Sequence, residues 1–381
     1  MKNDFGRPGS AATNVVVRGL VVGAVVSLAA FLASFVGSAQ AADVAWRPAK
    51  ELRFEGQGYG DVAAPFDRLP ARAEGVVRKP VWDLSRQSAG LSVRFTTDAP
   101  EIHARWTLTS ANLAMPHMPA TGVSGLDLYV KLGDGKWHWL ANGRPSAQTN
   151  TAVLARELGG ESREYLVYLP LYNGVSSLEI GVPAGAKLEP AAARAAKPVV
   201  VWGTSITQGG CASRPGMVHT AILARRLERD VINLGFSGNG KMEPEMARFI
   251  AEIDAAAYLI DCLPNMTAAE VTERVENVVK ILREKRPNAA IILAEDRTYS
   301  DAYLIKSKRE RNESSRKALR EAFARMQESK IPNVIYLPGE GQLGADEEGT
   351  VDSSHPTDLG FLRMADFFEP YLVKAIKLST P

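Results

Sequence analysis

Five short apolar runs separated by helix-like stretches fill the second half of the sequence and leave few folds open to it. The runs are Val199–Trp202, Val231–Leu234, Ala256–Cys262, Ala289–Ala294 and Asn333–Leu337. Stretches with helical periodicity follow them, at Met217–Leu227, Pro244–Ile253, Ala268–Lys285, Glu313–Glu328 and Asp358–Lys377. Buried strands that alternate with helices predict a parallel sheet, and right-handed crossovers place helices on both of its faces. Residues 199–381 are therefore predicted to form a three-layer α/β/α domain with a five-stranded parallel sheet.

The region before this domain has a different pattern, in which apolar and polar residues alternate over short runs. Leu91–Thr97 and Ile102–Leu108 are two examples, and turn signals such as Asn142-Gly143 separate such runs. Many half-buried strands joined by turns are typical of a sandwich or jelly roll. Residues 42–182 are predicted to form this all-β domain, and residues 183–198, rich in Ala and Pro, are predicted to link it to the second domain.

Residues 1–41 have the features of a secretory signal peptide. Basic residues up to Arg18 precede an uncharged apolar run, Gly19–Val36, and small residues from Ser38 to Ala41 supply a cleavage site. An uncleaved membrane anchor is the alternative, because the apolar run is long for a signal peptide. In both cases the folded part is predicted to act outside the cytoplasm, in the periplasm or secreted. No membrane span is expected to remain after cleavage.

Charge and cysteine content exclude several classes of protein. The net charge of +2 gives no electrostatic basis for binding nucleic acid. The two cysteines, Cys211 and Cys262, are too few for a disulfide scaffold or a zinc cluster. No group of His, Cys and carboxylate residues has the spacing of metal ligands, so neither a metal nor a cofactor is expected.

A serine follows the first of the five apolar runs. That run ends at Gly203, and Ser205 comes two residues later, at the sheet edge where α/β folds place their chemistry. A serine hydroxyl needs a base, and among the five histidines only His355 has a carboxylate, Asp352, three residues before it. One short loop could then deliver a histidine that faces Ser205 and an aspartate that orients its ring. The alternative is a loop aspartate that caps the last helix beside a surface histidine.

Two further strand ends carry candidates for stabilising an oxyanion. Gly238 follows the second run and would let a backbone N–H approach a ligand closely. Asn265 follows the third run and offers a side-chain amide. Since the carboxyl ends of parallel strands share one edge of a sheet, these residues are expected to lie near Ser205 and His355.

Taken together, these strings resemble the conserved blocks of the SGNH (GDSL-type) hydrolases. The matching strings are GTSITQG at 203–209, NLGFSG at 233–238, Asn265, and DSSHP at 352–356. The resemblance implies an SGNH, flavodoxin-like fold with Ser205 as nucleophile, His355 as general base and Asp352 as its partner. It also implies an oxyanion hole made by the Ser205 N–H, Gly238 and Asn265. Thr204 stands where the family usually has Asp.

The all-β region carries a second resemblance. The string GLDLY at 125–129 is similar to the G-x-D-L-Y signature of an N-terminal β-domain that precedes one subgroup of SGNH hydrolases. The resemblance implies a serine esterase without a cofactor, and the signal-like N-terminus predicts that it is exported. The exported location, the β-domain and the analogy with carbohydrate esterases of similar layout make acetyl esters of a carbohydrate the expected substrate. An O-acyltransferase that uses the same triad is one alternative. A non-catalytic protein that binds glycan or the cell envelope is the other.

Several polar and aromatic residues remain with two interpretations each. Arg214, Asp296, Arg297 and Tyr299 could hold substrate hydroxyls or a carboxylate, or could form structural ion pairs. Trp137 and Trp139 lie on one face of a strand and could stack on sugar rings or pack in the core. His103 and His138 are expected to be structural, and the role of His117 is open.

The two cysteines are candidates for a disulfide. Cys211 follows Ser205 by six residues, and Cys262 precedes Asn265 by three. The first and third strands are neighbours in a flavodoxin-like sheet, and disulfides persist in an exporting compartment. A bond between Cys211 and Cys262 that braces the loops around Ser205 is therefore a hypothesis.

Overall fold

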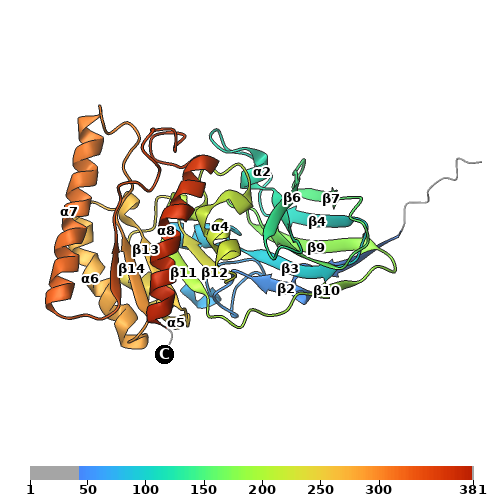
Figure 1. Ribbon diagram of the computed structural model, residues 1–381, viewed down its shortest axis with the longest axis horizontal. Helices are drawn as coiled ribbons and strands as arrows, with labels where there is room; N and C mark the ends of the chain where they lie inside the picture. The colour runs from blue at the N-terminus through green and yellow to red at the C-terminus, as the bar shows by residue number, and fades with distance from the viewer. Residues whose placement is uncertain (1–42, 380–381) are drawn as a thin grey trace, which may run out of the picture. The chain divides into compact units, whose positions relative to one another are not determined.

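Five parallel strands form the central sheet of the second half of the chain in the computed structural model, which describes residues 43–379 (Figure 1). The strands are β11 (Val199–Gly203), β12 (Val231–Gly235), β13 (Ala257–Asp261), β14 (Ala290–Ala294) and β15 (Val334–Leu337). Their order in the sheet is β12-β11-β13-β14-β15, and every neighbouring pair is parallel. The predicted five-stranded, flavodoxin-like sheet is confirmed. The predicted signal peptide lies outside the described residues.

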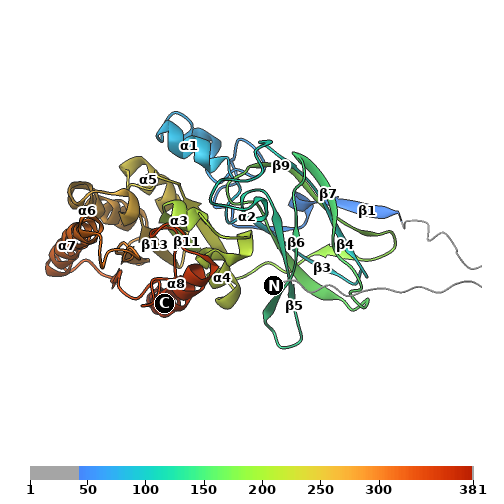
Figure 2. The ribbon, with the colours of Figure 1, turned by 90° about the horizontal axis from the view of Figure 1, so that it is seen from above.

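Helices cover both faces of this sheet (Figure 2). The elements are α3 (Ser205–Gln208), α4 (His219–Arg226), α5 (Pro244–Glu252), α6 (Ala268–Lys285), α7 (Lys306–Glu328) and α8 (Asp358–Leu378). Side chains of α5, α6 and α7 pack on one face, and those of α4 and α8 pack on the other. Helix α7 begins at Lys306 rather than at the predicted Glu313, because its first turns are charged and carry no apolar periodicity.

Two antiparallel sheets form the N-terminal part. One contains β1 (Val44–Pro48), β9 (Val175–Pro183), β4 (Ile102–Leu108) and β7 (Thr149–Ala155), in that order. The other contains β10 (Leu188–Pro190), β3 (Ser92–Thr97), β8 (Arg163–Tyr168), β5 (Leu126–Lys131) and β6 (Trp137–Gly143), with β2 (Arg53–Glu55) paired to β3. Side chains from both sheets meet in one buried core, which includes Phe95, Trp106 and Val167. The predicted β-sandwich is confirmed.

Two segments of the chain pack differently from the predicted division into two domains and a linker. Strand β10 lies within the stretch predicted as a linker and pairs with β3. The segment that contains α1 (Lys79–Ser85) packs on the α/β part, where Leu69 and Trp82 join the core beside α5. Buried Arg68 fixes this segment by donating to the carbonyl oxygens of Gly235 (2.8 Å) and Leu84 (2.7 Å). The exact domain limits remain a prediction.

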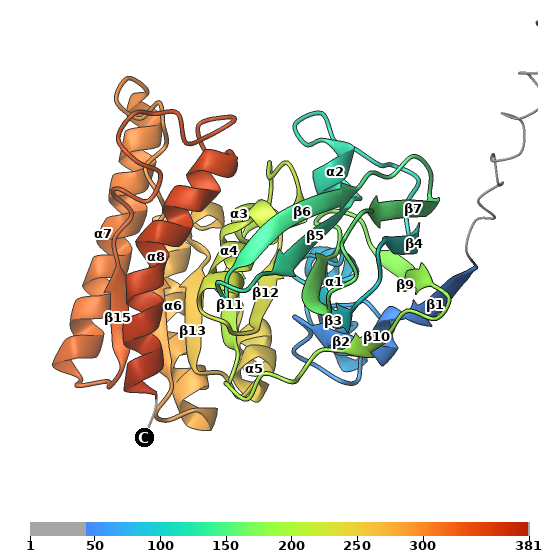
Figure 3. The same cartoon turned by 45° about the vertical axis from the view of Figure 1, so that its right-hand side comes forward.

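The outer face of the β5–β8 sheet packs against α4 (Figure 3). Tyr168 Oη donates to the carbonyl oxygen of Ala221 (3.1 Å). Asp127, the acidic residue of the GLDLY string, is fully buried and accepts from Arg214 Nη1 (2.7 Å), the Gly216 N–H (2.8 Å) and Trp139 Nε1 (2.8 Å). A buried carboxylate is stable only with such partners. The GLDLY string therefore joins the sandwich to the loop that follows Ser205.

A membrane-spanning helix needs about 20 predominantly apolar residues. Within residues 43–379, no helix is both long and apolar enough to cross a bilayer. The apolar run of the predicted signal peptide is not among the residues described.

His219 is buried in the apolar core between the sheet and α8. Its ring stacks on Phe361 (centroids 5.8 Å apart) and meets Phe368 edge-on (5.5 Å), and neither ring nitrogen has a partner among the described residues. Burial, assisted by the positive charge of Arg297, lowers the pKa of His219 from 6.5 to about 3. The folded state therefore holds a neutral imidazole here.

We expect His219 to make the protein less stable as the pH falls below about 6.5. The unfolded chain takes up a proton on this residue below that pH while the folded chain does not, so about 2 kcal/mol of unfolding free energy is lost by pH 5. Urea unfolding at pH 7 and pH 5 should show this loss in the wild type. The matched variant His219→Leu keeps a similar volume and should show a pH dependence smaller by that amount. Equal pH dependence in both proteins would contradict the assignment.

Candidate active site

The turn after β11 places Ser205 at the carboxyl edge of the sheet. Thr204, which stands where the family usually has Asp, is the N-cap of α3, and its Oγ1 accepts from the Ile206 N–H (3.3 Å). Gly203 is required because a Cβ there would lie 2.0 Å from Thr207 Oγ1. Gly209 ends the short helix in the left-handed region, with φ of 115°. Only 9% of Ser205 is exposed, so the surrounding chain fixes its position.

The structure brings together the three residues predicted as a triad. Ser205 Oγ lies 2.8 Å from His355 Nε2, and His355 Nδ1 lies 2.7 Å from Asp352 Oδ2. The second carboxylate oxygen, Asp352 Oδ1, accepts from the N–H groups of Ser354 (3.0 Å) and His355 (2.7 Å). This sequence of hydrogen bonds can move a proton from a serine hydroxyl to an imidazole that a carboxylate orients.

The environment keeps the Asp352 carboxyl ionised. Partial burial acts to raise its pKa, but the hydrogen bonds from the backbone and ring of His355 outweigh it, and the net pKa is lowered. Gly210 leaves room for the imidazole, since a Cβ there would lie 3.1 Å from His355 Cδ2 and 3.0 Å from Tyr172 Oη. An ionised Asp352 favours the tautomer in which Nδ1 carries the proton and Nε2 can accept one.

The loop that carries Asp352 and His355 is held by hydrogen bonds from residues before and at the start of α7. Ser353 has the left-handed φ of 73°, unusual for a residue with a side chain. Lys308 Nζ donates to Ser353 Oγ (2.6 Å), and the Ser300 N–H donates to the Ser353 carbonyl oxygen (3.0 Å). The start of α7 and the loop before it therefore fix the position of the loop that carries Asp352 and His355.

Three candidate oxyanion donors, the N–H groups of Ser205 and Gly238 and the Asn265 amide, follow the neighbouring strands β11, β12 and β13. The N–H groups of Ser205 and Gly238 donate to no residue of the described part of the chain. Gly238 has φ of 68°, with open space where a Cβ would be. The hydrogen-bond network orients the Asn265 amide so that its oxygen accepts from the N–H groups of Asn239 (3.0 Å) and Gly240 (3.2 Å). Its Nδ2 is then a donor for another group.

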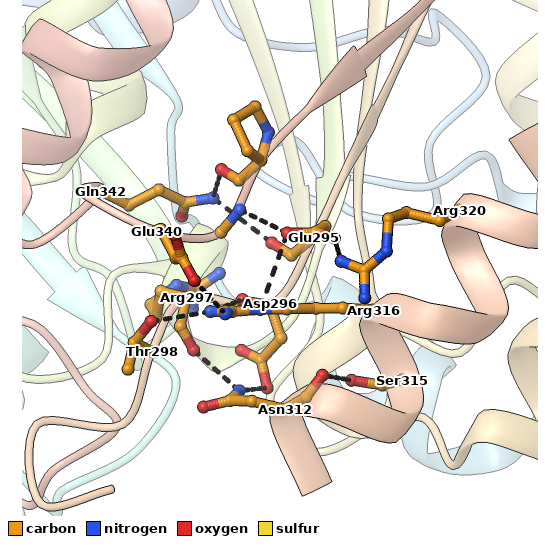
Figure 4. Close-up of polar contacts among 12 residues, drawn as sticks. Glu295, Asp296, Arg297, Thr298, Asn312, Ser315, Arg316, Arg320, Glu340 and Gln342 are labelled. Atoms are coloured by element: carbon orange, nitrogen blue, oxygen red, sulfur yellow. Dashed lines mark hydrogen bonds and ion pairs between the residues drawn. The ribbon is translucent and has the colours of Figure 1, made fainter. Parts of the chain in front are cut away.

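Two of the predicted substrate-binding residues are buried instead. Asp296 and Arg297 are 3% and 2% exposed. The Asp296 carboxylate accepts from Asn312 Nδ2 (3.3 Å), and its carbonyl oxygen accepts from Arg316 Nε (3.0 Å) (Figure 4). Arg297 Nη2 donates to Asp261 Oδ1 (2.9 Å). The structural interpretation holds for both residues, because neither reaches solvent where a substrate could bind.

The other two candidates keep some exposure. Arg214 pairs with Asp127 and donates to Tyr129 Oη (2.6 Å), but it also lines a groove of about 580 Å³ together with Trp137 and Trp139. Trp139 is 49% exposed, so it does not serve only core packing. Tyr299 is half-buried, and Arg311 connects it to the segment before Asn265 by donating to Tyr299 Oη (3.1 Å) and to the Pro264 carbonyl oxygen (2.7 Å).

Cys211 and Cys262 are free and buried, so the structure contradicts the predicted disulfide. Cys262 packs in the core on the α5–α7 face of the sheet, where its thiol faces the Trp202 carbonyl oxygen (3.6 Å). Cys211 packs in the core on the α4 and α8 face. Neighbouring strands bring the two segments near each other, but the side chains lie on opposite sides of the sheet. Among the residues described, no group of His, Cys or carboxylate residues could hold a metal ion.

The β-sandwich contributes to the site, which the sequence left open. Tyr172 Oη donates to the Ser205 carbonyl oxygen (3.2 Å), and the His117 ring centroid lies 6.4 Å from that of His355. No local pattern marks either residue as functional, since both lie in loops of the first domain. Contacts between the sandwich and the loop after Ser205 bring them to the site, such as the hydrogen bond from Thr121 Oγ1 to the Ser213 carbonyl oxygen.

Comparison with protein families assigns both parts of the chain. Residues 196–373 match the model of the GDSL-like lipase/acylhydrolase family, and residues 44–188 match the GxDLY model, the N-terminus of esterases of the SGNH-hydrolase type. Both resemblances stated from the sequence are confirmed. None of the curated proteins matches the sequence.

Several solved structures share the fold. One, named a GDSL-like lipase, from Bacteroides ovatus, is 37% identical, with a TM-score of 0.84, and the match covers 88% of this chain and 98% of that one. A salicylyl-acyltransferase from a tetracycline biosynthetic pathway is 19% identical, with a TM-score of 0.70, and the match covers 88% and 98% of the two chains. A family two carbohydrate esterase from Clostridium thermocellum, solved with cellohexaose, is 14% identical, with a TM-score of 0.57 and coverage of 76% and 94%.

Proposed function

The chain belongs to the GDSL-like lipase/acylhydrolase family of ester hydrolases, and we propose that it is an exported serine esterase that removes acetyl groups from a carbohydrate. The observation that carries the catalytic part is the chain of hydrogen bonds from Ser205 Oγ through His355 to Asp352, at 2.8 and 2.7 Å. The proposal of export rests on the signal-like sequence of residues 1–41.

In the proposed mechanism, Ser205 Oγ attacks the ester carbonyl while His355 Nε2 takes the hydroxyl proton. The N–H groups of Ser205 and Gly238 and the Asn265 amide donate to the oxyanion that forms. Collapse of this intermediate breaks the bond to the alcohol, which leaves with the proton from His355, and an acyl-Ser205 remains. Water then attacks the acyl group with His355 again as base, and the acid is released.

The proposed substrate class rests on the groove lined by Trp137 and Trp139. Its volume is about 580 Å³, and indole faces stack well on the apolar faces of sugar rings. The Trp139 ring is held in place because its Nε1 donates to Asp127 (2.8 Å). A fixed and exposed aromatic ring suits repeated binding of a glycan.

Trapping the acyl-enzyme tests the proposal directly. We expect that mixing the protein with p-nitrophenyl acetate and stopping the reaction with acid leaves one acetyl group on the peptide that contains Ser205, because denaturation stops water from being activated. Peptide mass spectrometry measures the site. Acetylation of a different residue, or none during turnover, would contradict Ser205 as the nucleophile.

The products then separate hydrolysis from the second candidate, O-acyl transfer, which the structurally similar salicylyl-acyltransferase brings into consideration. Release of free acetate from an acetylated xylo-oligosaccharide supports the esterase. Acetate that appears on an added sugar acceptor, with little free acetate, favours the transferase. A protein that binds the oligosaccharide without either reaction would instead be a glycan-binding module.

A further inference from the structure

A tight turn of the β-sandwich lies beside the candidate catalytic histidine. Met115 and Met118 pair through two backbone hydrogen bonds of 3.0 Å, which leaves Pro116 and His117 at the tip of the turn. Met118 is only 2% exposed and packs in the same core as Cys211 and Ala212. The turn is therefore anchored at its base, while His117 at its tip is exposed.

The chain after this turn is tied to the loop that follows Ser205. Thr121 Oγ1 donates to the Ser213 carbonyl oxygen (2.6 Å), and Gly122 packs so closely that a Cβ there would lie 2.3 Å from the Ala212 carbonyl oxygen. The Tyr172 N–H donates to the Val123 carbonyl oxygen (3.2 Å). These contacts hold the His117 turn in a fixed place relative to Ser205 and His355.

The geometry of ester cleavage indicates which part of the substrate would meet His117. His355 must deliver its proton to the oxygen of the departing alcohol, so the alcohol lies on the His355 side of Ser205. The carbonyl oxygen faces Gly238 and Asn265 instead. The His117 ring, whose centroid lies 6.4 Å from the His355 ring, neighbours the residue that would protonate the alcohol.

We propose that His117 is a positioning residue that binds a hydroxyl group of the alcohol part, and that it selects polyhydroxy alcohols such as sugars over simple ones. The proposal rests on the esterase function proposed above. A neutral imidazole has one donor and one acceptor, which matches a hydroxyl next to the ester. The His117 ring makes no hydrogen bond with any residue in the described range, 43–379, so both nitrogens are available to a substrate.

The test compares two acetate esters, an acetylated methyl glucoside with free hydroxyls and p-nitrophenyl acetate with none. For His117→Ala we expect kcat/KM to fall about tenfold on the glucoside ester, mainly through KM, and less than twofold on p-nitrophenyl acetate. His117→Gln keeps a donor and an acceptor and should recover part of the loss. The matched control is His138→Ala, which removes an exposed histidine that pairs with Asp134 on the sandwich and should leave both rates unchanged.

Each other outcome has a defined meaning. Equal losses on both esters, or no loss on either, would overturn the role of His117 in binding the alcohol. Turnover of p-nitrophenyl acetate without turnover of the glucoside ester by the wild type would overturn hydroxyl recognition and leave the esterase intact. Turnover of p-nitrophenyl acetate that persists in Ser205→Ala would instead overturn the proposed function itself.

Discussion

Replacing Ser205 by alanine is expected to lower kcat on p-nitrophenyl acetate by about 10⁴-fold or more. The variant loses the atom that attacks the carbonyl, and the partners of Ser205 Oγ cannot replace it, because His355 Nε2 at 2.8 Å is oriented to accept a proton from it. The oxyanion donors remain, so a small rate above that in water should persist. Steady-state kinetics with substrate above KM measures the effect.

The structure also predicts that this loss is not caused by unfolding. The Ser205 hydroxyl makes its hydrogen bond to His355 at the edge of the site, while the turn is held by Thr204, Gly203 and the helix α3. The unfolding free energy of Ser205→Ala should therefore stay within about 1 kcal/mol of the wild type. Activity close to that of the wild type, in a folded variant, would exclude the serine mechanism.

The site residues that could be predicted from the sequence are those that the sheet topology brings together. Ser205, Gly238, Asn265 and the Asp352–His355 loop all follow strands of one parallel sheet, and such a sheet aligns the carboxyl ends of its strands at one edge. Spacing alone could therefore place these groups near one another. The same logic placed the five strands, whose ends differ from the prediction by a residue at most.

The remaining features depend on side-chain directions and on contacts between the two parts of the chain. Cys211 and Cys262 lie near neighbouring strands, but their side chains enter opposite cores. Arg297 follows the end of a strand, which is where residues of a cleft are expected. Its side chain instead points into the protein, where it donates to Asp261. His117 and Tyr172 belong to the sandwich and lie at the site because the sandwich packs against the α/β part. The pattern of apolar residues in the sequence does not predict this packing. Sequence spacing predicts which residues share an edge, and packing decides which of them reach solvent.

The buried ion pair of Asp261 and Arg297 is expected to contribute strongly to the free energy of unfolding. Both side chains are at most 1% exposed, and Asp261 also accepts from Thr207 Oγ1 (3.3 Å), beneath the turn that carries Ser205. Burial raises the pKa of Asp261 to about 6, although Arg297 acts to lower it. Removing the arginine would leave a buried carboxylate with Thr207 as its remaining partner.

We therefore expect Arg297→Met to lose about 3 to 5 kcal/mol of unfolding free energy at pH 7, because an uncompensated buried charge is costly. Without Arg297 the pKa of Asp261 rises further, so the folded variant takes up a proton as the pH falls, and the unfolded chain does so only near pH 4. The deficit relative to the wild type should thus shrink between pH 7 and pH 5. Urea unfolding at both pH values measures it.

The double variant Asp261→Asn, Arg297→Met is the matched control, because it removes both charges and keeps the volumes similar. It should be more stable than Arg297→Met alone at pH 7, and its difference from that variant should nearly vanish at low pH, where the carboxyl is neutral. If Arg297→Met unfolds within 1 kcal/mol of the wild type, or if its deficit is the same at pH 7 and pH 5, the pair does not support the sheet edge beneath Ser205 in the way described.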